Sequence, residues 1–286
     1  MLLALSGAVM GNPISLVITS GPGSNQDTLA RIVAPMLSKE LGREVVVLVT
    51  PGANGLVGMQ KFALMPADGS ALLMGTMAVP YVAKTGVNPC FDPIKDLEPL
   101  HGLTQSRSQV LVRSDSPARN MREFVAWSKL SDGLFGGTAV PATTLFIDDL
   151  GRALKVKLIP TGYKQTSQIG LDLAAGRLDF TVSVVGNAAM QPHIDSGRIR
   201  AIGFTDNLSS EGFHNLNMVV WSALMVNAAT PPEDKARLTA AATKVAKSQA
   251  FKDALATRIE GGFVYDVPAA EVKKRIAHEF SIIPVN

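Results

Sequence analysis

Two glycine-rich loops, each placed between an apolar run and a helix, constrain this chain more than any other feature. The first follows residues 14–19 and reads Ser20-Gly-Pro-Gly-Ser-Asn-Gln-Asp27. The second follows residues 45–49 and reads Thr50-Pro-Gly-Ala-Asn-Gly-Leu-Val-Gly58. Such a loop exposes unpaired backbone N–H groups at a helix N-terminus, where the helix dipole favours negative charge. Two of them in succession predict a protein that holds a small anion.

Strand-like runs alternate with helical patterns along nearly the whole chain. The run at residues 45–49 is apolar and rich in β-branched residues, which is typical of a strand buried on both faces. Apolar residues follow the first loop at helical spacing: Leu29, Ile32, Val33, Met36, Leu37 and Leu41. Gly42 is placed to end that helix. We therefore predict an α/β fold with mostly parallel sheets and helices on both faces.

The same alternation predicts two lobes. Further strands are expected at residues 71–75, 109–113, 134–137, 156–159, 178–185 and 199–205. Further helices are expected at residues 57–64, 121–130, 143–154, 167–175, 230–256 and 268–280. Lobe 1 is predicted to hold residues 12–104 and 222–286, and lobe 2 residues 105–221. The chain is expected to cross near residues 105–112 and 213–223, and a cleft walled by strand ends is where α/β proteins bind ligands.

Composition excludes several classes of protein. The 286 residues are 47% hydrophobic and 18% charged, as in a globular protein with a substantial core. The net charge is only +3 and the basic residues are scattered, so nucleic acid is not an expected partner. The one cysteine, Cys90, excludes an internal disulfide and a cysteine-rich metal site. Acidic residues and histidines do not cluster at ligand spacing, so neither a metal nor a cofactor is expected.

The apolar residues 1–11 resemble the tail of a secretory signal, although they lack a basic n-region. The alternative is a flexible or partly packed N-terminus. No other apolar stretch approaches the ~20 residues that a membrane span needs.

Catalytic motifs are missing. The chain has no Gly-x-Ser-x-Gly elbow, no His-Glu-x-x-His and no Gly-Lys-Ser/Thr phosphate loop. Gly21 and Gly23 match the first two glycines of a dinucleotide fingerprint, but Gln26 replaces the third. Thr50 follows the second strand where that fingerprint needs an acid for the ribose. These departures favour a binding protein over an enzyme, and a Rossmann-like cofactor-binding enzyme is the minor alternative.

Several motifs in order resemble one family, from about residue 14 to residue 280. Besides the two loops, the chain carries Pro66-Ala-Asp-Gly-Ser-Ala-Leu-Leu-Met-Gly75, Phe91-Asp-Pro-Ile-Lys-Asp-Leu-Glu-Pro99, Tyr163-Lys164 and Gly176-Arg-Leu-Asp179. Together they resemble the Bug, or TctC-like, receptors of tripartite tricarboxylate transporters. The first loop departs from the family pattern, having lost an aromatic residue and two glycines and gained serines and Asn25. Ser183 stands where an aspartate is often found.

The resemblance implies a two-lobe periplasmic-binding-protein-like fold of type II. It implies an extracytoplasmic, periplasmic monomer that closes on a small organic acid and delivers it to integral membrane transporter subunits. A sensor input of the same fold is the alternative. One ligand carboxylate is expected against the two loops, partly through water.

The predicted ligand-binding residues come from both lobes. In lobe 1 they are Ser20, Gly21, Ser24, Asn25, Asp27, Asn54, Gly55 and Thr76. In lobe 2 they are Thr138, Ala139, Thr143, Tyr163, Ser183 and Asn187. For two of these residues, a purely structural role competes with the ligand-binding role. Asp27 is placed either to meet the ligand through water or to cap the helix, and Tyr163 either lines the pocket or packs at an interface.

Overall fold

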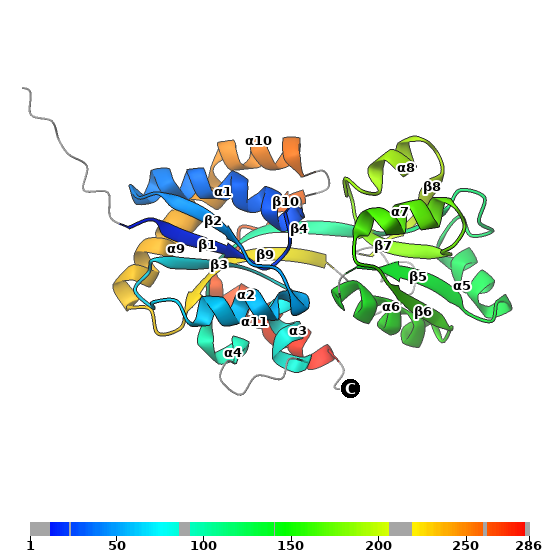
Figure 1. Cartoon of the computed structure of the whole chain (residues 1–286), viewed down its shortest axis with the longest axis horizontal. Coiled ribbons are helices and arrows are strands. Elements are labelled where there is room, and N and C mark those ends of the chain that lie inside the picture. The colour runs from blue at the N-terminus through cyan, green and yellow to red at the C-terminus, as the bar shows by residue number, and fades with distance from the viewer. Residues whose placement is uncertain are drawn as a thin grey trace, which may run out of the picture.

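The computed structural model describes residues 12–22, 24–85, 92–139, 141–205, 219–259 and 262–283. Two α/β lobes lie side by side along the long axis of the molecule (Figure 1). Both termini of the described chain belong to one lobe, called lobe 1 here, and lobe 2 is built from the middle of the sequence. Residues 1–11, Cys90 and His214 lie outside the described residues.

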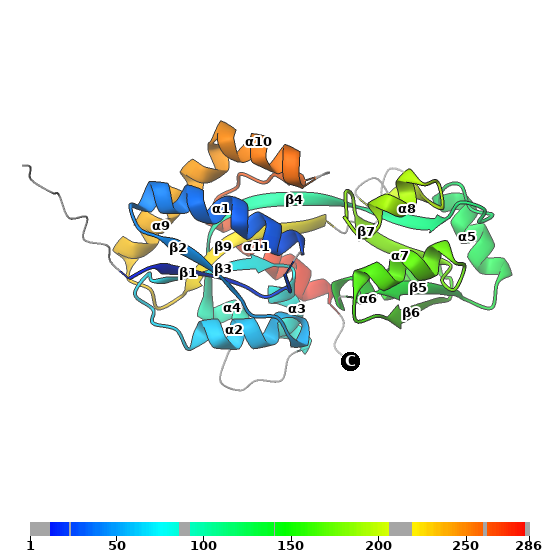
Figure 2. The same cartoon turned by 45° about the horizontal axis from the view of Figure 1, so that its top comes forward.

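Lobe 1 is a mixed sheet between two layers of helices. Its strands are β1 (Ile14–Ile18), β2 (Val45–Val49), β3 (Ala71–Thr76), β9 (Val219–Asn227), β10 (Gly262–Val264) and the first part of β4 (Leu97–Arg113). Its helices are α1 (Asn25–Leu41), η1 (Ala53–Gly55), α2 (Leu56–Ala63), α3 (Ala78–Thr85), α4 (Pro93–Asp96), α9 (Pro232–Lys247), α10 (Gln249–Arg258) and α11 (Ala269–Ile282). Figure 2 shows α1 and α10 on one side of the sheet and α2 on the other.

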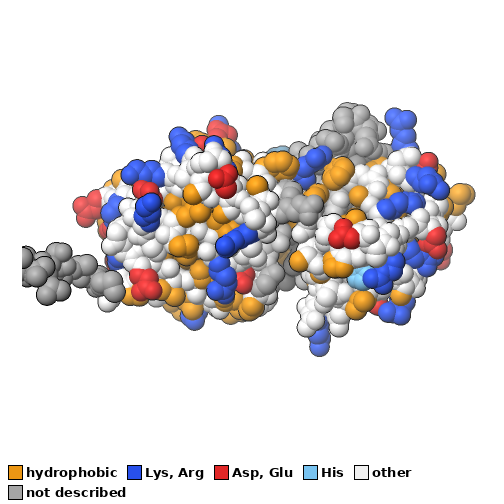
Figure 3. Space-filling model, turned by 90° about the horizontal axis from the view of Figure 1, so that it is seen from above, with side chains coloured by type: hydrophobic (Ala, Val, Ile, Leu, Met, Phe, Trp, Pro, Cys, Tyr) orange, Lys and Arg blue, Asp and Glu red, His pale blue; other side chains and the backbone are white. Residues whose placement is uncertain are grey.

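Lobe 2 repeats this plan on a smaller scale. Its strands are β5 (Leu134–Thr138), β6 (Leu158–Gly162), β7 (Phe180–Val184), β8 (Ile199–Phe204) and the second part of β4. Its helices are α5 (Met121–Leu130), α6 (Pro141–Leu154), α7 (Thr166–Ala174) and α8 (Gln191–Asp195). Seen from above, the outline of the molecule narrows between the two lobes (Figure 3).

The long strand β4 joins the two sheets. Its first part pairs with β9 as far as Arg107↔Val219, and its second part pairs with β7 from Ser108↔Val184 onward. The chain therefore leaves one sheet and enters the other between Arg107 and Ser108. The second passage, after Thr205 and before Val219, lies outside the described residues.

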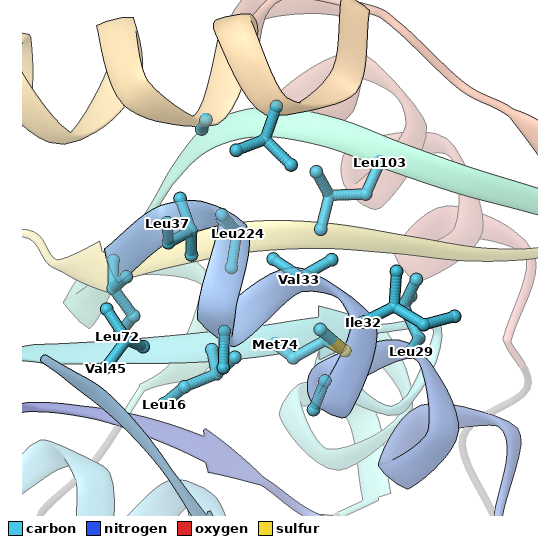
Figure 4. Packing of buried hydrophobic residues seen from close by; sticks show 14 of the residues in the cluster. Leu16, Leu29, Ile32, Val33, Leu37, Val45, Leu72, Met74, Leu103 and Leu224 are labelled. Carbon is cyan, nitrogen blue, oxygen red and sulfur yellow. The ribbon is translucent and has the colours of Figure 1, made fainter. Parts of the chain in front are cut away.

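Alternating apolar residues build the lobe-1 core. Leu29, Val33 and Leu37 of α1 belong to one buried cluster with Leu16 of β1 and Leu72 of β3, and all five are at most 2% exposed (Figure 4). Leu224 of β9 and apolar residues of α9 and α10 complete this layer. Burying each such leucine contributes about 1.5–3 kcal/mol, so this layer fixes the position of α1 on the sheet. Gly42 ends α1 with a left-handed φ of 61°, as predicted.

The α/β class with two lobes is confirmed, with one addition to the predicted strand directions. β1 pairs in parallel with β2 and β3, and β5 in parallel with β6 and β7. Every pair made by β4 or β9 is antiparallel, so the sheet is mixed.

Several elements differ from the sequence prediction. β4 starts at Leu97 and not near residue 109, because Pro99, Gly102 and two register shifts hide its alternation. The single helix predicted for residues 230–256 is two helices, separated at Ser248, whose hydroxyl accepts a hydrogen bond from Phe251 N. The short elements α3, α4, α8 and β10 were not predicted.

Candidate functional site

The carboxyl ends of the parallel strands of both lobes meet near the crossing of β4. The end of β3 pairs through Thr76 with Ser222 of β9, which pairs with Thr104 of β4. The end of β7 pairs through Val184 with Ser108 of β4. Since strands rise about 3.3 Å per residue, these two levels on β4 are roughly 13 Å apart. The predicted loops of the two lobes therefore begin on either side of this short interval.

The first loop is held by α1 and by β3. The Ser24 hydroxyl accepts a hydrogen bond from Asp27 N at 3.2 Å and so caps α1. Gln26 is buried, and its Oε1 accepts from Thr19 N at 3.1 Å and Ser20 N at 2.8 Å. Its Nε2 donates to the Met74 carbonyl of β3 at 2.7 Å. The backbone N–H of Ser20 is thus already engaged, which leaves its hydroxyl for a ligand.

The start of α1 offers donors to an anion. Within the described residues, no acceptor contacts the backbone N–H of Asn25 or Gln26. Gly21 has open space where a Cβ would stand. These donors lie at the positive end of a 17-residue helix.

The N-cap of α1 is Ser24, and Asp27 lies in the first turn of the helix. Its buried carboxylate pairs with Arg31 Nε at 2.9 Å. Arg31 partly neutralises the Asp27 carboxylate, which lies next to the N–H donors. The loop therefore repels an anionic ligand less than it would if Asp27 were unpaired.

The second loop depends on glycine for a close approach to β1. Gly55 has a φ of 99°, and a Cβ there would lie 3.2 Å from Thr19 Oγ1. A Cβ on Gly58 would lie 2.6 Å from the Thr50 carbonyl oxygen and 2.8 Å from Thr19 Cγ2. The two glycines therefore let η1 and α2 sit against the end of β1, next to the first loop. Asn54 lies in η1 between Ala53 and Gly55, and its side chain is outside the described structure.

Thr76 is the last residue of β3 and closes a turn. Its hydroxyl accepts a hydrogen bond from Ala78 N at 3.2 Å, at the start of α3. Its cross-strand partner Ser222 and the next partner, Thr104, also carry hydroxyls. Cross-strand partners point to the same face, so these three hydroxyls form a row over β3, β9 and β4.

Three predicted lobe-2 residues gather at the start of α6. Thr138 ends β5, and its hydroxyl lies 3.1 Å from the hydroxyl of Thr144. Ala139 follows directly, and Thr143 is buried in the first turns of α6. This arrangement repeats the strand-to-helix geometry of the first loop on the opposite lobe.

The remaining predicted residues make local contacts. Tyr163 donates its hydroxyl to Asp172 of α7 at 2.8 Å, and burial together with this carboxylate raises the pKa of the tyrosine. Ser183 is buried on β7 and pairs with Gln109 of β4. Asn187 accepts from Ala189 N at 2.9 Å in the turn after β7. The Tyr163 hydroxyl is therefore hydrogen-bonded to α7, while Ser183 and Asn187 lie at the end of β7 nearest the crossing.

Sequence reasoning missed two features of this region. Gln26 escaped because its partner Met74 is distant in sequence. The run Thr104-Gln-Ser-Arg-Ser-Gln109 was not singled out, although six consecutive polar residues within a strand are a usable signal. Arg107 is the charged member of this run.

Neither a metal-binding cluster nor a membrane-spanning helix is found among the described residues. No group of three His, Cys, Asp or Glu side chains there could hold a metal ion. Likewise, no helix in the described ranges is both long enough and apolar enough to cross a bilayer.

Comparisons with known proteins point to one family. The model of the "Tripartite tricarboxylate transporter family receptor" family, TctC, matches residues 29–280. A UPF0065 protein of Bordetella bronchiseptica is 30% identical over 233 residues, which cover 77% of this chain and 69% of that protein.

Solved structures share the fold. Rpa4515 of R. palustris with adipate has a TM-score of 0.81 at 20% identity, with 94% of both chains covered. MatC of Rhodopseudomonas palustris with bound malate has a TM-score of 0.77 at 21% identity, covering 94% of this chain and 96% of MatC.

Proposed function

Since the chain belongs to the TctC family of tripartite tricarboxylate transporter receptors, we propose that it captures a small organic carboxylate between its lobes. It then delivers this acid to the integral membrane subunits of a tripartite transporter. In this role the protein is a periplasmic, monomeric receptor and not an enzyme.

One observation carries the proposal. Two glycine-shaped loops adjoin at the ends of β1 and β2, and the first of them presents backbone N–H groups at the start of α1 that no acceptor among the described residues contacts. Backbone donors and a helix dipole bind a carboxylate without a buried cation, whose desolvation would be costly. Two solved proteins of the same fold hold adipate and malate, both of which are carboxylates.

Each lobe has a part in capture. Ser20, Gly21, Ser24 and Asn25 contact one carboxylate together with the second loop. Thr138, Ala139 and Thr143 reach the ligand from lobe 2. Contacts to both lobes stabilise the closed arrangement over the open one, and the transporter then recognises the closed form.

A thermal-shift screen tests the proposal. Organic acids and their amide analogues are added to the purified chain. A ligand that binds only the folded state at a hundredfold excess over Kd stabilises it by about 2.7 kcal/mol. A shift with an acid and none with its amide supports the receptor. No shift with any acid, from folded protein, contradicts it.

A matched pair of variants locates the site. Gly21→Asp places a carboxylate at the first loop, where nothing lies within 4 Å of the new Cβ. It should abolish the acid-induced shift and leave the unliganded protein folded. Leu130→Asp adds the same charge at a residue 90% exposed at the end of α5 and should leave the shift unchanged.

A further inference from the structure

One apolar residue of lobe 1 packs against the hydrophobic cores of both lobes. Met77 lies between the end of β3 and the start of α3, and it is partly buried. It packs against a lobe-1 cluster that includes Val79 and Trp221. It also packs against a lobe-2 cluster that includes Phe146 and Ile147 of α6. Among the apolar residues of the described ranges, no other one takes part in clusters of both lobes.

The contact lies on the side of the molecule that carries the predicted binding residues. Thr76, a predicted ligand residue, directly precedes Met77. In lobe 2, α6 follows Thr138 and Ala139, which are also predicted ligand residues. Figures 1 and 2 show α3 and α6 on the facing sides of the two lobes. An apolar contact at this place therefore draws the two halves of the proposed site together.

The turn that carries Met77 is held by local hydrogen bonds. Ala78 N donates to Thr76 Oγ1 at 3.2 Å, and Tyr81 N donates to the Met77 carbonyl at 3.3 Å. The backbone at Met77 is thus fixed to lobe 1. The methionine side chain is unbranched and carries a polarisable thioether, so it adapts to the surface that it meets. Met77 can therefore keep its contact with lobe 2 while the angle between the lobes changes slightly.

We infer that Met77 is a positioning residue that limits how far the two lobes separate before a ligand binds. β4 joins the lobes without a break in pairing, so wider opening bends this strand and draws Met77 out of the lobe-2 cluster. The apolar surface that is then exposed to water opposes the opening. The effect of Met77 on affinity rests on the proposed function, but the contact between the lobes requires no ligand.

Two measurements on the unliganded full chain test this role. In Met77→Ala the lobes should separate further, so the radius of gyration from small-angle X-ray scattering should exceed that of the wild type. Amide hydrogens in α6 should exchange faster, by about threefold or more, because this helix of lobe 2 loses a packed neighbour from lobe 1. Met77→Gln keeps the length of the side chain but makes its end polar, and it should change both measurements in the same direction.

Met65→Ala is the matched control. Met65 is also partly buried and packs against the same lobe-1 cluster, but it takes no part in the lobe-2 cluster. This variant should lose stability without changing the radius of gyration or the exchange of α6. Met77→Leu keeps an apolar side chain of similar volume and should match the wild type in both measurements. Thermal melts show that each variant is folded.

Binding gives a third measurement. The probe is the acid that produces the largest thermal shift in the screen described above, titrated by calorimetry. It should bind Met77→Ala about threefold more weakly than the wild type, because a smaller fraction of the unliganded chain has its lobes close together. Met65→Ala should keep the wild-type affinity.

Failure of this role and failure of the proposed function give different results. An unchanged radius of gyration and unchanged α6 exchange in folded Met77→Ala overturn the role of Met77 and leave the receptor function standing. Tighter binding of the acid by Met77→Ala also overturns it, because the contact would then oppose closure. A larger radius in Met77→Ala together with no thermal shift from any acid supports the role of Met77 and contradicts the receptor function.

Discussion

Gln26 is the single residue on which the first loop most depends. Its amide joins the end of β1 to β3 and places α1 over both strands. All three hydrogen bonds involve backbone groups at a buried or partly buried position. A side chain with both an acceptor and a donor is required there, which glutamine supplies and an aliphatic residue does not.

Gln26→Ala should lower the free energy of unfolding by about 1–3 kcal/mol, because it leaves buried backbone groups without partners. Urea unfolding followed by circular dichroism measures this loss. Gln191→Ala is the control, since that amide makes one exposed contact with Asp195. A Gln26→Ala protein as stable as the control would show that water replaces the amide at no cost.

The buried carboxyl group of Glu279 makes the stability of the fold depend on pH. Burial raises the pKa of this carboxyl, although Arg275 and the Trp221 indole, which donates to it at 2.8 Å, partly offset the shift. Between the ordinary and the raised pKa the folded state binds more protons than the unfolded state. The contribution of Glu279 to stability therefore falls as the pH rises through this window.

The stability advantage of the wild type over Glu279→Gln should therefore shrink as the pH rises from about 4.5 through the raised pKa. Unfolding free energies of both proteins, measured from about pH 4.5 to about pH 8, give this difference directly. A difference that stays constant, or that grows with pH, contradicts the raised pKa.

At the scale of elements, the close contact of α2 with β1 decides where the second loop lies. An exposed helical glycine replaced by alanine normally stabilises a protein by about 0.5–1 kcal/mol. At Gly58 the new Cβ would meet the backbone of Thr50 and the side chain of Thr19 below 3 Å. Overpacking of this kind costs about 1–3 kcal/mol and exceeds the gain.

We therefore expect Gly58→Ala to lower the melting temperature and to weaken acid binding, since α2 moves away from β1. Gly162→Ala is the control for stability, because nothing lies within 4 Å of its new Cβ. Relative to the wild type, the two variants should shift the melting temperature in opposite directions or by amounts that differ by several degrees. Equal melting temperatures would show that α2 shifts freely.

Elements set by local pattern were predictable from the sequence, and those set by distant contacts were not. The helix predicted for residues 121–130 matches α5, because its spacing and the Asn120 cap are encoded nearby. β4 was predicted only in its second part, where Val110 to Val112 are apolar. Its first part depends on pairing with β9, from the far end of the chain. In the site, the loops were predicted by glycine, while Gln26 gains its role only from partners that the fold brings near.

At the scale of the whole molecule, the two lobes are joined by one continuous strand and a second passage. Ligand contacts on both sides of the crossing favour a closed arrangement, as proposed above. β4 itself has no break in pairing at Arg107 and Ser108, so closure must twist or bend this strand and not separate it.

Small-angle X-ray scattering tests closure directly. Saturation with an acid that raises the melting temperature should reduce the radius of gyration, because the lobes approach each other. The amide analogue serves as the control and should leave the radius unchanged. An identical radius with and without a tightly bound acid would contradict closure.

The position of β9 in the sheet has a consequence for how the chain acquires its structure during synthesis. β9 lies between β3 and β4, yet it comes after the whole of lobe 2 in the sequence. Until residues 219–227 have been synthesised, no strand can pair with both β3 and β4, and the lobe-1 sheet is not continuous. Contacts between distant segments form slowly, because the chain entropy must be lost first. The lobe-1 sheet can therefore be completed only after the whole of lobe 2 has been synthesised.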